Sequence, residues 1–195
     1  MKKFAVFASG NGSNFEAIAN RLKQENWDAE LSLLVTDKPQ AKAVERAEAL
    51  NIPSFAFEPS AYENKAAFER EMIEQLRLHG AELIVLAGYM RLIGDTLLKA
   101  YGGKIINIHP SLLPAFPGID AVGQAHRAGV KVAGITIHYV DEGMDTGPII
   151  AQKAFEIQEN DTLEDMEKTI HELEHKWYPS IIKQLLGLNN RGEKA

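Results

Sequence analysis

The chain has 195 residues, of which 45% are hydrophobic and 25% are charged, a balance typical of globular proteins with a sizeable core. Its formal net charge of −6 argues against a general nucleic-acid or membrane-binding surface, and the lack of cysteine excludes a disulfide framework and a thiol nucleophile. The lack of cysteine also fits a reducing compartment, so we expect a cytoplasmic protein that works without a membrane or nucleic-acid partner.

The first part of the chain alternates short apolar runs with segments of helical spacing. We expect strands over 3–9, 29–36, 54–57, 83–89 and 105–109, and helices over 14–24, 43–50 and 65–79. Strands that alternate with helices predict βαβ units. The fold class is therefore α/β, with a Rossmann-like, doubly wound and mostly parallel sheet that carries helices on both faces.

The second part of the chain has a different pattern. Apolar runs at 133–140 and 149–157 are separated by DEGMDTGP, which is too short for a crossover helix, so we expect an antiparallel C-terminal part. A long helix over 163–186, kinked by Pro179, closes the fold. We expect one domain over residues 1–187 and a flexible tail over 188–195.

The first strand leads into SGNGSN (9–14), directly before a helix. Glycines there let a ligand approach the backbone, and the N–H groups of a helix N-terminus favour phosphate. The pattern is no dinucleotide fingerprint, because Phe15 stands where a glycine or alanine would follow, and it lacks the lysine of a Walker A loop. The alternative is a tight turn in which Ser13 or Asn14 caps the helix.

The fifth strand ends in Asn107 and His109, which a period of two places on one face. The three prolines that follow, in HPSLLPAFP, stiffen the loop beside this histidine. Together these features indicate a site rather than a structural histidine. The other five histidines are expected to be structural, and none of them predicts a metal site. Asp145, in the turn after the sixth strand, is a candidate partner for His109, or simply a turn former.

The sequence has no nucleophile elbow of the G-x-S-x-G type. Asn, His and Asp without a nucleophile suit catalysis of an attack by another molecule, because an amide and an imidazolium can stabilise an oxyanion and the carboxylate keeps the histidine charged. The alternative class is a non-catalytic nucleotide-binding module. Such a module would need only the glycine loop and would leave the three polar residues unexplained.

NIHPSLLPAFPG (107–118) and GITIHYVDEGMDTGPII (134–150) closely resemble the formyltransferases that use 10-formyltetrahydrofolate. The resemblance runs from FASGNGSN to EHKWYP and covers nearly the whole chain. It implies formyl transfer to the amine of glycinamide ribonucleotide in purine synthesis, by a monomer or homodimer without a metal. Methionyl-tRNA formyltransferase and formyltetrahydrofolate deformylase are the alternatives within the family. We expect neither, because each has an additional domain for which this chain lacks the length.

The resemblance also implies roles for single residues. Asn107, His109 and Asp145 would be catalytic, Gly12, Ser13 and Asn14 would hold the phosphate, and Glu174 would lie near the substrate amine or ribose. Folate-binding residues would be Lys65, Met90, Arg91, Leu92, Ile93, Asn107, Val140, Asp141, Gly143 and Met144. Lys65 departs from the arginine often found there and lacks its bidentate fork.

Glu174 also stands out without the resemblance. It lies between Ile170 and Trp177 at helical spacing, so a carboxylate occupies the apolar stripe of the last helix. The alternative is a boundary residue whose carboxylate is solvated.

Overall fold

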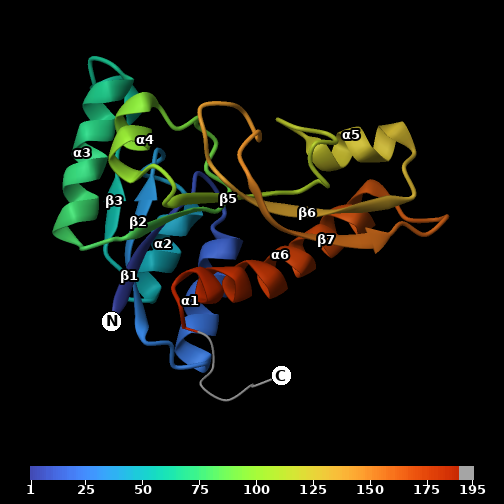
Figure 1. Cartoon of the computed structure of the whole chain (residues 1–195), viewed down its shortest axis with the longest axis horizontal. Helices are drawn as coiled ribbons and strands as arrows, with labels where there is room; N and C mark the ends of the chain where they lie inside the picture. The colour runs from blue at the N-terminus through green and yellow to red at the C-terminus, as the bar shows by residue number, and fades with distance from the viewer. Residues whose placement is uncertain (189–195) are drawn as a thin grey trace.

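A computed structural model describes residues 1–188 of the chain (Figure 1). Seven strands form one sheet in the order β3-β2-β1-β4-β5-β6-β7. The strands are β1 (Lys2–Phe7), β2 (Ala29–Thr36), β3 (Ser54–Ala56), β4 (Leu83–Leu86), β5 (Ile105–His109), β6 (Val132–Tyr139) and β7 (Ile149–Glu156). The first five strands are parallel, whereas β6 is antiparallel to both β5 and β7. The predicted α/β class and the antiparallel C-terminal part are confirmed.

The helices cover both faces of the sheet. They are α1 (Ser13–Gln24), α2 (Lys42–Ala49), α3 (Lys65–Leu78), α4 (Asp95–Tyr101), α5 (Ala121–Ala128) and α6 (Leu163–Leu185). Buried side chains of α1, α2 and α6 join one apolar cluster with the sheet, and those of α3 and α4 join a second cluster on the opposite face. Figure 1 shows α3 and α4 together on one side, with α1 and α6 on the other. The doubly wound arrangement is confirmed.

The chain reverses its direction of winding between β1 and β4, which are neighbours in the sheet. It moves outward from β1 to β2 and β3, and then returns to place β4 on the other side of β1. In open α/β sheets, ligands bind outside the carboxyl ends of the strands at such a point. The segments that follow β1, β4 and β5 all emerge at this edge.

Two helices are not predicted from the sequence. The helices α4 and α5 have only 7 and 8 residues. Short segments show little periodicity, and Gly123 further lowers the helix propensity of α5. The strand expected over 83–89 ends at Leu86, and Gly88 then has a φ of 75°.

The last helix is continuous through Pro179. The Tyr178 hydroxyl donates to the Leu86 carbonyl at 2.8 Å, which ties α6 to the centre of the sheet. Leu188, the first residue of the expected tail, packs against the core, and its N–H donates to the Lys183 carbonyl. The rest of that tail, 189–195, lies outside the described residues.

Candidate active site

A cavity of about 630 Å³ opens at the carboxyl ends of β1, β4 and β5. It collects nearly all the residues predicted from sequence for the site. Those that line it are Gly12, Ser13, Asn14, Met90, Arg91, Leu92, Ile93, Asn107, His109, Val140, Asp141, Gly143, Met144, Asp145 and Glu174. Segments that are far apart in the sequence therefore form one site.

Lys65 is the exception among the predicted site residues. It is the exposed first residue of α3 and is not among the residues that line the cavity. Its side chain lies beside Gly94, because a Cβ built on that glycine would be 2.8 Å from the Lys65 Cε. Residues 88–93 line the cavity, and Lys65 lies behind this segment rather than on the side that faces the cavity.

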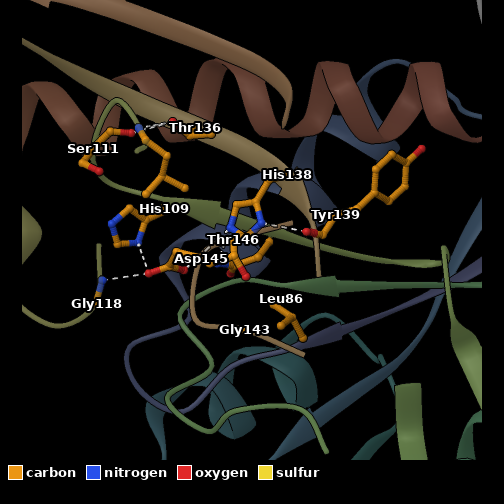
Figure 2. A network of polar contacts seen from close by, with 12 residues as sticks. Leu86, His109, Ser111, Gly118, Thr136, His138, Tyr139, Gly143, Asp145 and Thr146 are labelled. Carbon is orange, nitrogen blue, oxygen red and sulfur yellow. Dashed lines mark hydrogen bonds and ion pairs between the residues drawn. The ribbon is translucent and has the colours of Figure 1, made fainter. Parts of the chain in front are cut away.

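The three predicted catalytic residues converge. Nδ1 of His109 lies 3.3 Å from Oδ2 of Asp145, with both side chains largely buried (Figure 2). Nε2 of His109 is 2.9 Å from the carbonyl oxygen of Phe116, to which it donates. Because a carboxylate and a carbonyl only accept, both ring nitrogens of His109 face hydrogen-bond acceptors.

His138 belongs to the same cluster. In the antiparallel pairing of β5 with β6 it lies opposite Asn107, and its Nε2 is 3.2 Å from the Asn107 amide nitrogen. The same Nε2 is 3.7 Å from Oδ1 of Asp145, and Nδ1 donates to the Tyr139 carbonyl at 2.8 Å (Figure 2). The sequence predicted a structural histidine without polar partners here, whereas the structure places His138 beside Asn107 and Asp145. Only the register between the two strands brings it there, and that register is not visible in either segment alone.

Asp145 is held in place by backbone geometry and by the loop after β5. Its own φ is 57°, in the left-handed region, and its Oδ2 accepts a hydrogen bond from the Gly118 N–H at 2.8 Å. Asp145 is thus a turn former as well as a partner of His109. The segment 118–122, in which no functional residue is predicted from the sequence, also lines the cavity.

The glycine loop forms another part of the cavity lining. Gly12, with a φ of 74°, is the N-cap of α1, so the helix cap by Ser13 or Asn14 that the alternative reading requires is not found. A Cβ on Gly12 would lie 2.8 Å from the Ala43 Cβ, so the loop lies tightly against α2. The N-terminus of α1, whose first N–H groups have no partner within a helix, therefore adjoins the cavity that Gly12, Ser13 and Asn14 line.

Glu174 joins the last helix to this loop. Its Oε2 accepts a hydrogen bond from the Asn14 side-chain nitrogen at 3.0 Å, and only 6% of the residue is exposed. The alternative of a solvated boundary carboxylate is wrong. His171, which lines the same cavity, also donates to this oxygen at 3.1 Å. That hydrogen bond raises the pKa of His171 above its ordinary value, with burial acting in the opposite direction.

The family model described as formyl transferase matches residues 2–182, which is almost the whole chain. The chain belongs to the formyl transferase family. Within this family, it is 84% identical to the phosphoribosylglycinamide formyltransferase of Bacillus subtilis, over the full length of both chains. A crystal structure of glycinamide ribonucleotide transformylase 1 from Geobacillus kaustophilus has 56% sequence identity, a TM-score of 0.93, and coverage of 96% of this chain and 100% of that one.

The family resemblance extends to larger proteins. The chain is 38% identical to the trifunctional purine biosynthetic protein adenosine-3 of Gallus gallus, over 93% of its own length but 18% of that protein. In residues 1–188 of this formyl transferase, no three His, Cys, Asp or Glu side chains are grouped as metal ligands. None of the helices in this described part combines the length and apolar character needed to cross a membrane.

Proposed function

We propose that the chain transfers the formyl group of 10-formyltetrahydrofolate to the amine of glycinamide ribonucleotide, giving the formylated ribonucleotide and tetrahydrofolate in purine biosynthesis. The observation that carries this function is the 84% identity, over the full length of both chains, to the Bacillus subtilis phosphoribosylglycinamide formyltransferase. The geometry agrees with it, because the glycine loop and the Asn–His–Asp cluster line the same cavity.

In the proposed mechanism, the site holds two reactants together and stabilises the charge that develops between them. The substrate amine attacks the formyl carbon, and the formyl oxygen becomes an oxyanion. The Asn107 amide and the protonated ring of His109 stabilise this oxyanion. His138 orients the Asn107 amide through their 3.2 Å contact. Collapse of the intermediate breaks the bond to the folate nitrogen.

The proton balance assigns a second task to the histidine–aspartate pair. The attacking amine loses a proton, and the departing folate nitrogen gains one. Asp145, which lies 3.3 Å from His109, passes the amine proton through a water molecule toward the leaving nitrogen. Nε2 of His109 donates to the Phe116 carbonyl in the free protein. That hydrogen bond must open if this nitrogen is to face the reacting atoms.

Binding is divided between the two ends of the cavity. Gly12, Ser13 and Asn14 would hold the phosphate, with Glu174 near the amine or ribose. Segment 90–93 and segment 140–144 would enclose the folate, with Met90 and Met144 exposed at 72% and 49% and available for a flat ring system. Lys65 would act only at the outer edge of the folate wall.

We further propose that residues 1–187 work as a single formyltransferase domain, as a monomer or homodimer in the cytoplasm. The reaction needs no metal in this mechanism. A formyl-transfer assay with glycinamide ribonucleotide and 10-formyltetrahydrofolate, following tetrahydrofolate formation, tests the activity. A folded protein that hydrolyses the folate without formylating the ribonucleotide would contradict the proposal. Sedimentation of the purified chain distinguishes monomer from dimer.

A further inference from the structure

Segment 88–94, which follows β4, forms one wall of the cavity with its residues 88–93. The segment contains no helix or strand, so no ladder of backbone hydrogen bonds fixes its conformation. Two buried carboxylates, Asp37 and Glu69, lie behind this wall, and neither lines the cavity. Burial of a carboxylate is costly unless hydrogen bonds or charges compensate it, so the partners of each indicate what it does.

Asp37 holds the first part of the segment. It follows β2, and only 6% of it is exposed. Its Oδ1 accepts a hydrogen bond from the Ser9 hydroxyl at 2.6 Å, and its Oδ2 accepts from Nε of Arg91 at 2.9 Å. The Ser9 oxygen in turn accepts from the Met90 N–H at 2.9 Å. One carboxylate therefore fixes the backbone at Met90 and the side chain of Arg91.

Glu69 holds the other end of the segment. It projects from α3, and only 2% of it is exposed. Its Oε1 accepts from the Gly94 N–H at 2.6 Å, and its Oε2 accepts from the Leu97 N–H at 3.2 Å. The carboxylate thus caps the N-terminus of α4, where the helix dipole favours a negative charge. It also fixes the point at which the wall joins this helix.

The lack of a side chain at Gly94 permits this contact. Its φ and ψ of −97° and 173° are open to any residue, so its backbone does not require glycine. A Cβ at this position would, however, lie 2.8 Å and 2.9 Å from the two carboxylate oxygens of Glu69. The absent side chain therefore leaves room for the Glu69 carboxylate at the backbone N–H.

We propose that Asp37 and Glu69 are positioning residues that set the conformation of segment 88–94 and thereby the affinity for the folate co-substrate. This role rests on the proposed function, because it assumes that segment 88–94 contacts the folate. Neither carboxylate touches a reactant in this role. Losing Glu69 should weaken folate binding selectively, because the ribonucleotide end of the cavity is built from the glycine loop and α6, on the opposite face from α3.

The test is calorimetric binding of tetrahydrofolate to Glu69→Gln, Gly94→Ala and Asp37→Ala, together with steady-state kinetics for both substrates. In Glu69→Gln the side-chain NH2 would face one of the two backbone N–H groups, of Gly94 or Leu97, that the carboxylate now accepts from. In Gly94→Ala the methyl group would displace the carboxylate. For both we expect the Kd for tetrahydrofolate and the KM for the folate to rise about tenfold or more. The KM for the ribonucleotide should change less than about twofold.

For Asp37→Ala we expect the folate constants to rise more than the ribonucleotide KM, because Ser9 adjoins the glycine loop. Asp37→Asn should recover most of the folate affinity, because its oxygen can accept from Arg91 while its amide donates to Ser9. A purely structural carboxylate would not raise the folate constants more than the ribonucleotide KM.

Three control variants separate positioning from loss of stability. Glu74→Gln changes an exposed carboxylate of the same helix, and Asp28→Ala changes an exposed carboxylate at the other end of β2. Tyr101→Phe removes a buried hydroxyl of α4 that donates to the Ala81 carbonyl. We expect Tyr101→Phe to lower the Tm without changing the Kd for tetrahydrofolate.

Wild-type affinity for tetrahydrofolate in both Glu69→Gln and Gly94→Ala would overturn the positioning role, as would equal rises in the KM values of both substrates. Those results differ from a failure of the proposed function, in which the wild-type chain itself would not formylate glycinamide ribonucleotide.

Discussion

Oδ2 of Asp145 lies 3.3 Å from Nδ1 of His109 and at the same time accepts the Gly118 N–H at 2.8 Å. One carboxylate oxygen therefore connects the end of β5, the loop that follows β5 and the turn after β6. The Asp145 side chain is 12% exposed and that of His109 is 6% exposed, so their attraction is poorly screened by water. We therefore expect substitutions in this pair to affect the reaction strongly.

His109→Ala and Asp145→Asn should each lower kcat by roughly 10²-fold or more, because each removes charge stabilisation and proton transfer at the reacting atoms. Steady-state kinetics of the folded variants measure the effect. Glu142→Gln, an exposed carboxylate in the same turn, is the control and should keep wild-type kcat. Near-wild-type turnover by His109→Ala would remove this residue from the chemistry.

His138→Gln should lower kcat by about tenfold while leaving both KM values close to wild type, because the Asn107 amide loses a fixed partner but binding surfaces remain. Steady-state kinetics with both substrates check this result. His126→Gln, on the exposed side of α5, is the matched control. An effect confined to the KM for folate would instead assign His138 to the folate wall.

Gly12→Ala should reduce the free energy of unfolding by roughly 1–3 kcal/mol, because it strains a left-handed backbone and drives a methyl group against Ala43. It should also raise the KM for the ribonucleotide more than the KM for the folate. The stability control is Gly10→Ala, since a Cβ at Gly10 would meet nothing within 4 Å. Urea unfolding and kinetics measure the two effects, and equal changes in both KM values would count against a phosphate site in this loop.

His171 should make stability depend on pH. Its pKa is raised in the folded protein, chiefly by the hydrogen bond to Glu174 and further by the charges of Glu174 and Glu167, while burial disfavours its charge. The extra stability is therefore fully present below the unfolded pKa of about 6.5, and it is lost as pH rises through the folded pKa.

The free energy of unfolding of the wild type, minus that of His171→Gln, should be larger at about pH 5.5 than at about pH 8.5 in urea titrations. His175, whose pKa burial lowers, has the opposite dependence, but it is present in both proteins and largely cancels. Added salt should reduce the difference, because the His171 side chain is 62% exposed. A difference that grows with pH would show that the Glu174 contact does not favour the charged histidine.

The sequence by itself determined the alternation of strands and helices. Hydrophobic periodicity is a local property, so β2 and β5 have the bounds that it predicts, and the long segments of α1, α3 and α6 are recognisable. Asn107 and His109 were likewise predicted to share a face, because a period of two follows from strand geometry alone. The glycine loop predicted a phosphate ligand, and the family motifs predicted a folate ligand.

Only the tertiary structure decided which side chains meet. His138 enters the site through the register of β5 with β6, and Asp145 reaches His109 through a left-handed turn closed by Gly118. Lys65 is left outside the lining because α3 places it behind Gly94. Such contacts depend on the pairing of segments far apart in the chain. That pairing is set by burial of the whole sheet and its helices rather than by any local pattern.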